Sequence, residues 1–74
     1  MSAHTLEKLI YMANQIARNV THEPDPVAMI ADHVHAFWSP RMKDDVFAAL
    51  GGPEGAALDP VARAALERLA AHAD

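Results

Sequence analysis

The sequence predicts an all-α protein, a compact array of about four short helices that forms a single helical domain over residues 1–74. Apolar residues recur at helical spacing in four segments, and a capping residue followed by proline introduces three of them. No segment alternates with the period of two that is typical of a half-buried strand. A chain of 74 residues is also shorter than most domains, so it forms one domain at most.

The first predicted helix has the clearest periodicity. Its apolar residues follow the i, i+3, i+4, i+7 spacing of one helix face: Leu6, Leu9, Ile10, Ala13, Ile16, Ala17 and Val20. Its opposite face is polar: Glu7, Lys8, Asn14 and Arg18. Pro24 and Pro26 end this helix, because proline lacks a backbone N–H and disfavours helical geometry in the residue before it.

The second and third predicted helices each begin with a cap and a proline. Asp25 precedes Pro26, and Ser39 precedes Pro40, so a sharp corner separates the two helices. The apolar stripe of the second helix consists of Val27, Ile30, Ala31, Val34, Phe37 and Trp38. The third helix has a shorter apolar face: Met42, Val46, Phe47 and Leu50.

A glycine-rich loop separates the third helix from the fourth. We expect Gly51 and Gly52 to end the third helix through a left-handed turn, which glycine adopts readily. The loop continues to Ala57, and Asp59 with Pro60 then forms the third cap and proline. The fourth helix again has apolar residues at helical spacing: Val61, Ala62, Ala65, Leu66, Leu69 and Ala70.

Size and charge narrow the possible functions. A chain this short buries only about 60% of the surface that its unfolded form exposes, yet 51% of its residues are hydrophobic and none is cysteine. These features favour a partner that covers apolar surface. The net charge of −4 argues against nucleic-acid binding, which needs clustered Lys and Arg. No stretch approaches the ~20 apolar residues of a membrane span, and no signal peptide is visible, so we expect a cytoplasmic protein.

The residues that could carry chemistry do not form a catalytic pattern. His33 and His35 are two apart on a predicted helix, so they point in different directions and cannot chelate one ion together. We expect surface histidines, with His33 at most half-buried. The glycine loop lacks the preceding strand and the following Lys-Ser/Thr of a phosphate-binding loop. The sequence therefore predicts no catalytic, metal or cofactor site on this chain.

Residues 37–42, Phe-Trp-Ser-Pro-Arg-Met, combine an aromatic pair, a rigid corner, an arginine and a methionine. Trp and Arg are enriched in interface hot spots, but aromatic residues also anchor cores. We favour the core for Phe37, whereas for Trp38 the core and an interface stay open alternatives. Adjacent aromatic residues on one helix cannot point the same way, so one of them is expected to leave the main core. The candidate partner-contact residues are Asn14, Trp38, Arg41 and Met42.

Three stretches also resemble a known family, the small delta subunit of soluble, NAD-dependent, molybdenum-type formate dehydrogenases. They are residues 12–17 (Met-Ala-Asn-Gln-Ile-Ala), residues 30–42, and residues 58–61 (Leu-Asp-Pro-Val). The second stretch is the most specific, because it ends in Phe-Trp-Ser-Pro-Arg-Met. Family members tend to have phenylalanines directly after the first motif, where this chain has Arg-Asn-Val at 18–20.

The resemblance implies an accessory subunit without redox cofactors of its own. The larger formate dehydrogenase subunits would hold a molybdenum or tungsten pterin, iron–sulfur clusters, FMN and NAD. This chain would stabilise the complex, or assist its maturation, by packing on a large subunit. Two other readings stay open: a free-standing helical regulator, such as a small helix-turn-helix protein, and an assembly or metal chaperone outside the complex.

Overall fold

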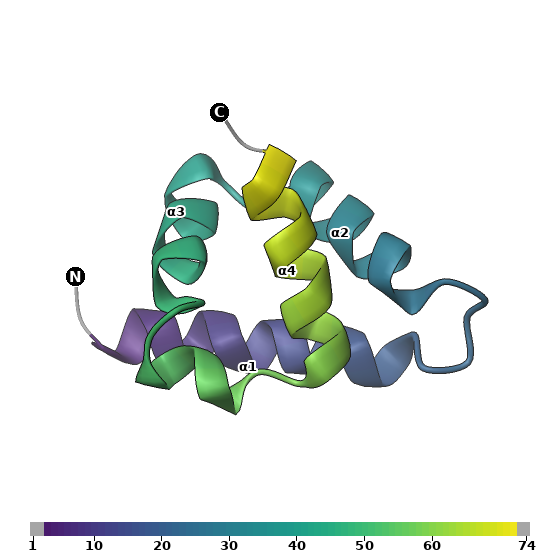
Figure 1. The fold of residues 1–74 in the computed structure, drawn as a ribbon, viewed down its shortest axis with the longest axis horizontal. Coiled ribbons are helices and arrows are strands. Elements are labelled where there is room, and N and C mark those ends of the chain that lie inside the picture. Colours follow the sequence, from purple (N-terminus) through teal and green to yellow (C-terminus); the bar gives the residue numbers. More distant parts are fainter. Residues whose placement is uncertain (1–2, 73–74) are drawn as a thin grey trace.

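The computed structural model describes residues 3–72, which form an all-helical array (Figure 1). Four α-helices and one short 3-10 helix follow one another along the chain: α1 (Ala3–Asn19), α2 (Pro26–Phe37), α3 (Pro40–Ala49), η1 (Pro53–Ala57) and α4 (Pro60–His72). No strand occurs within these residues. The predicted fold class is therefore confirmed, and η1 is the one element that the sequence pattern did not predict.

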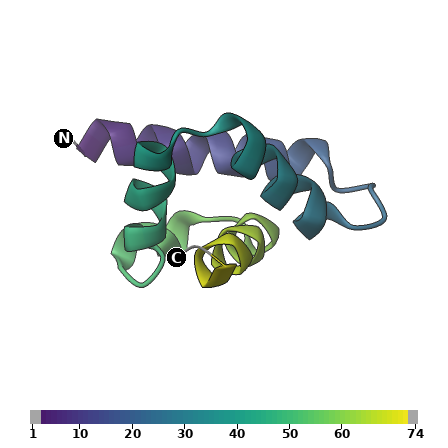
Figure 2. The same ribbon diagram turned by 90° about the horizontal axis from the view of Figure 1, so that it is seen from above.

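The three shorter helices are arranged against α1, the longest (Figures 1 and 2). In Figure 1, α1 runs along the base, α3 and α2 lie toward its two ends, and α4 lies between them. The most extensive packing joins α2 to α4, which are adjacent in space although α3 and η1 separate them in sequence. The array measures 35 × 25 × 20 Å.

One hydrophobic core joins residues from all four α-helices and from Leu58, just after η1. Its largest fully buried side chains are Ile30, Val34, Val46 and Leu66. Three alanines on α1 and α4 are also completely buried: Ala13, Ala62 and Ala65. Small side chains at these positions allow helix axes to approach closely. Part of the high alanine content therefore serves packing within the chain.

Each predicted cap forms the hydrogen bond that defines it. The Asp25 carboxylate accepts from Ala28 N at 3.1 Å, and the Ser39 hydroxyl accepts from Met42 N at 3.2 Å. At the third start, Asp59 Oδ1 accepts from Val61 N at 2.9 Å. These bonds satisfy N–H groups that have no partner within a helix, and proline follows each cap where no N–H is needed.

The expected left-handed turn at the end of α3 is wrong, because no glycine has a positive φ. The chain instead continues in tight i→i−3 turns. Leu50 N donates to Phe47 O at 3.2 Å, and Gly52 N donates to Ala49 O at 3.0 Å. These bonds satisfy carbonyl groups at the end of the helix without any left-handed residue, and η1 follows at once.

Within residues 3–72, no helix is both long enough and apolar enough to cross a membrane.

Candidate partner-binding surfaces

The aromatic pair at the corner between α2 and α3 divides between core and surface. Trp38 is only 5% exposed and belongs to the core, whereas Phe37 is 75% exposed. The prediction that Phe37 belongs to the buried stripe of the second helix is therefore wrong. The reason is helical register: Trp38 follows the buried Ile30 and Val34 at i+4 spacing, and its N–H still donates to Val34 O at 3.0 Å. Phe37 instead lies on the neighbouring, exposed flank of α2.

Phe37 is the last member of an exposed row along α2, which also contains Met29 and His33 at i, i+4 spacing. We call these three residues the α2 ridge. Met29 is 45% exposed, and the rings of His33 and Phe37 lie in tilted contact, with centroids 4.9 Å apart. His33, expected to be at most half-buried, is exposed. The ridge thus exposes a phenylalanine and part of a methionine on the flank of α2, with a histidine between them.

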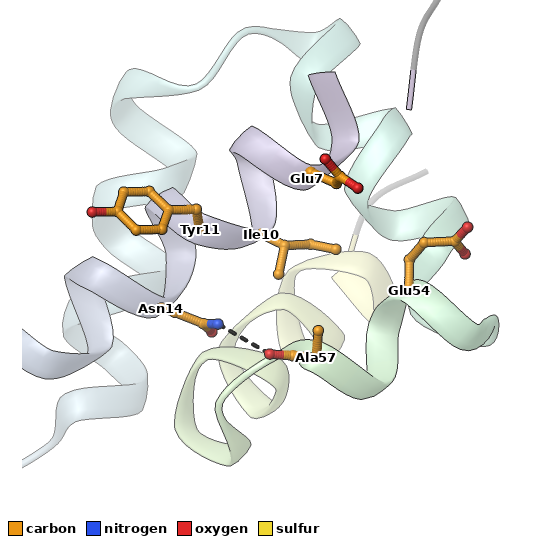
Figure 3. A pocket seen from close by; sticks show the side chains of 6 residues that line it. All are labelled: Glu7, Ile10, Tyr11, Asn14, Glu54 and Ala57. Atoms are coloured by element: carbon orange, nitrogen blue, oxygen red, sulfur yellow. Dashed lines mark hydrogen bonds between the residues drawn. The ribbon is translucent and has the colours of Figure 1, made fainter. Parts of the chain in front are cut away.

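Asn14 links α1 to the start of α4. Its amide Nδ2 donates to Ala57 O at 3.0 Å (Figure 3). Its Oδ1 accepts from Asp59 N at 2.7 Å. Asp59 in turn caps α4 through Val61 N. Both functional groups of the Asn14 amide are thus used within the chain, where they fix the end of η1 on α1.

Arg63 holds the other side of the same loop. From α4, its Nη1 donates to Gly55 O at 2.8 Å and its Nη2 donates to Leu50 O at 2.7 Å. Its Nε also forms an ion pair with Glu67, at 3.1 Å, one helical turn later. The glycine-rich loop is therefore an ordered structure held by side chains from two helices, α1 and α4. Nothing in the spacing of Asn14 and Arg63 along the chain predicts this arrangement.

A groove of about 410 Å³ lies between α1 and η1 (Figure 3). Six residues line it: Glu7, Ile10, Tyr11, Asn14, Glu54 and Ala57. Ile10 is buried and points into the space between the two elements, whereas the ring of Tyr11 points away from η1. The two glutamates, one from each element, are the charged residues of the lining.

The corner, the Asn14 bonds and most of the groove fall within one stretch that matches a known family. The family model of the NADH-dependent formate dehydrogenase delta subunit, FdsD, matches residues 8–66. The chain belongs to this family. No curated protein and no solved structure shows significant similarity to the chain.

The structure of this delta-subunit family member places the four candidate contact residues in different environments. Arg41 is the most accessible: its side chain is 72% exposed, and its Nε lies 4.0 Å from Asp45 Oδ1 in a surface ion pair of the kind that contributes little. Met42 is half-buried against the core. Trp38 is buried and Asn14 is bonded within the chain. Contact of these residues with a partner stays a prediction.

The histidines that the structure describes do not converge. His33 and His35 are both exposed on α2, and His72 Nδ1 lies 2.9 Å from Arg68 O in the last turn of α4. His4 lies outside the residues whose side chains are described. Among the described residues, no three His, Cys, Asp or Glu side chains come together in a group that could hold a metal ion.

Replacing Asn14 by alanine should lower the free energy of unfolding by about 2 kcal/mol, because two hydrogen bonds are lost and the one from Asp59 N is partly buried. Gln15→Ala removes a similar amide from the next, half-buried position and should change it by less than about 0.5 kcal/mol. Urea denaturation followed by circular dichroism measures both. Equal losses in the two variants would show that the Asn14 bonds contribute nothing specific.

Proposed function

We propose that this chain is a non-catalytic accessory subunit of an NAD-dependent formate dehydrogenase complex, and that it packs on a large subunit through the α2 ridge and the corner that follows it. The proposal rests on the family to which the chain belongs. Packing would stabilise the complex or assist the maturation of the catalytic subunit. The molybdenum or tungsten pterin, the iron–sulfur clusters, FMN and NAD would lie on the larger subunits of a cytoplasmic enzyme.

The exposure of Phe37 is the observation that carries the proposed surface. A phenylalanine that is 75% exposed, in the same row as a partly exposed methionine, leaves apolar area in water that a partner could cover. Aromatic residues and methionine are enriched in interfaces. Because α2 is anchored by Ile30 and Val34 in the core, the ridge is carried on a rigid helix and loses little entropy on binding.

The corner after the ridge offers a polar contact beside the apolar one. Arg41 lies in the first turn of α3 and is largely exposed. Its weak ion pair with Asp45 could be exchanged for a carboxylate of the partner at little cost. In this arrangement Trp38 and Met42 would support the surface from below, because both pack in or against the core.

Phe37→Asp should weaken binding to the other dehydrogenase subunits by about 30-fold or more, since an aromatic hot spot contributes about 2 kcal/mol and the new carboxylate would lose water on docking. The test is co-purification of the tagged chain with the remaining subunits, with binding constants from surface plasmon resonance. Formate-dependent NAD reduction by the eluted complex identifies the partner.

Ala71→Asp is the matched control, because it adds the same charge at an exposed position in the last turn of α4. It should bind within about twofold of the unmodified chain. If the chain elutes alone while the dehydrogenase assembles and works fully without it, the proposal is wrong and the free-standing regulator becomes the hypothesis to test.

A further inference from the structure

We propose that the groove between α1 and η1 is a second contact site, which takes an extended segment of a partner subunit in which an aliphatic side chain neighbours a lysine or arginine. The inference rests on the proposed function, because it assigns the segment to a subunit of the same complex. It concerns a different surface from the α2 ridge: the groove is lined by α1 and η1, and no residue of α2 contributes to it.

The groove has the size and the apolar floor that a side chain needs. Its volume of about 410 Å³ falls within the range of ligand sites, about 300–1,000 Å³. Ile10 forms part of this floor, and the methyl group of Ala57 lies across from it on the η1 side (Figure 3). An aliphatic side chain placed between them would be covered from both elements.

The negative charge of the lining favours a basic residue next to that aliphatic side chain in the partner segment. Glu54 lines the groove from η1 and is exposed. Its carboxylate lies beyond Ile10 in Figure 3. A cation of the partner placed beside Glu54 would meet complementary charge, which favours the correct partner and its orientation. The net charge of the whole chain, −4, would likewise attract a basic segment.

Tyr11 lies at the opposite edge (Figure 3), and the residue is 63% exposed. It is the single tyrosine of the chain. Tyrosine is frequent in binding surfaces because a rigid ring gives contact area at a low cost in entropy. A segment that passes over the floor and leaves past this edge would bury the ring.

The groove is also fixed before anything binds. Its Asn14 side chain bonds Ala57 O, and Arg63 bonds Gly55 O in the middle of η1. The α1 and η1 walls are therefore held together by the protein itself, which reduces the ordering cost of binding. A second copy of this chain is a poor occupant, because it carries the same net negative charge, and an anionic membrane surface is disfavoured on the same ground.

Glu54→Lys tests the charge, in binding experiments with the dehydrogenase subunits purified without this chain. We expect affinity to fall by about tenfold and its dependence on salt to become weaker, because one attractive charge is replaced by a repulsive one. Glu23→Lys is the matched control, since it makes the same change in net charge beyond the other end of α1, in the turn before α2 (Figure 1). It should bind within about twofold of the unmodified chain. An unchanged melting temperature shows that Glu54→Lys, an exposed position, keeps its fold.

A photo-reactive p-benzoylphenylalanine in place of Tyr11 identifies the segment. Mass spectrometry of the cross-linked complex should find a peptide with a lysine or arginine next to an aliphatic residue. If Phe37→Asp weakens binding while Glu54→Lys does not, or if the cross-link maps to an acidic peptide, the groove proposal is overturned and the proposed function stands. If the unmodified chain does not bind these subunits at all, both are overturned.

Discussion

Trp38→Ala should lower the free energy of unfolding by about 3–5 kcal/mol, the usual cost of removing a large aromatic side chain from a core. Trp38 is 5% exposed, and it lies at the point where α2 ends and the chain turns toward α3. A domain of this size has a total stability of roughly 4–11 kcal/mol at about 0.05–0.15 kcal/mol per residue. The loss is therefore a large fraction of the total stability, and a domain at the low end of that range would unfold at 25 °C.

The adjacent substitution Phe37→Ala is the control, because it truncates an aromatic residue of the same helix end that is mostly in water. It should change the free energy of unfolding by less than about 0.5 kcal/mol. Urea denaturation followed by circular dichroism at 222 nm suits both, since it does not depend on the tryptophan that one variant lacks. A larger loss for Phe37→Ala than for Trp38→Ala would mean that the two rings have exchanged places.

This pair of residues also shows what a helical pattern can and cannot predict. The spacing of Ile30, Val34 and Trp38 is helical, and a pattern that continues past the last helical residue assigns both aromatic rings to one stripe. The two rings separate because Trp38 lies in the buried row of Ile30 and Val34. Phe37 lies in the exposed row of Met29 and His33. The sequence predicted that one ring would leave the core, but it favoured the wrong one.

The helix starts, in contrast, were predictable because capping is a local interaction. The side chain of a cap such as Asp25, Ser39 or Asp59 accepts from a backbone N–H two or three residues later, so the whole interaction lies within a few consecutive residues. The bonds that hold the glycine-rich loop are different. Asn14 reaches residues 43 and 45 positions later in the chain, and Arg63 reaches back 13 positions to Leu50. Only the packed helices bring these groups together.

For the candidate surfaces, too, some features could be predicted from the sequence and others could not. The family was predictable, because long motif strings such as residues 37–42 can be compared directly, and the family match confirms it. The exposure of individual residues was not predictable, because residue type alone does not reveal it. Asn14 and Trp38 were singled out by type and motif, yet one is bonded inside the chain and the other is buried. Phe37 and Tyr11, the two most exposed large apolar residues, were not among the candidates.

Gly55→Ala should lower the free energy of unfolding by about 3 kcal/mol, the upper part of the range for overpacking. The reason is close approach and not a special φ, because no glycine has a positive φ. A Cβ atom on Gly55 would lie 2.5 Å from Ala49 O and 2.8 Å from Leu50 O, which are backbone atoms and cannot rotate away. Both oxygens are also held in place: Gly52 N donates to the first and Arg63 to the second.

Gly51→Ala is the matched control, since a Cβ atom at Gly51 would have nothing within 4 Å. It should leave stability unchanged or raise it by up to about 1 kcal/mol, because alanine restricts the unfolded chain more than glycine does. Urea denaturation of the two variants under identical conditions gives the comparison. Equal midpoints would show that Gly55 does not lie this close to Ala49 O and Leu50 O. If Gly55→Ala is destabilised as expected, it should also bind the dehydrogenase subunits less well, because the displaced η1 carries Glu54 and Ala57, which line the groove.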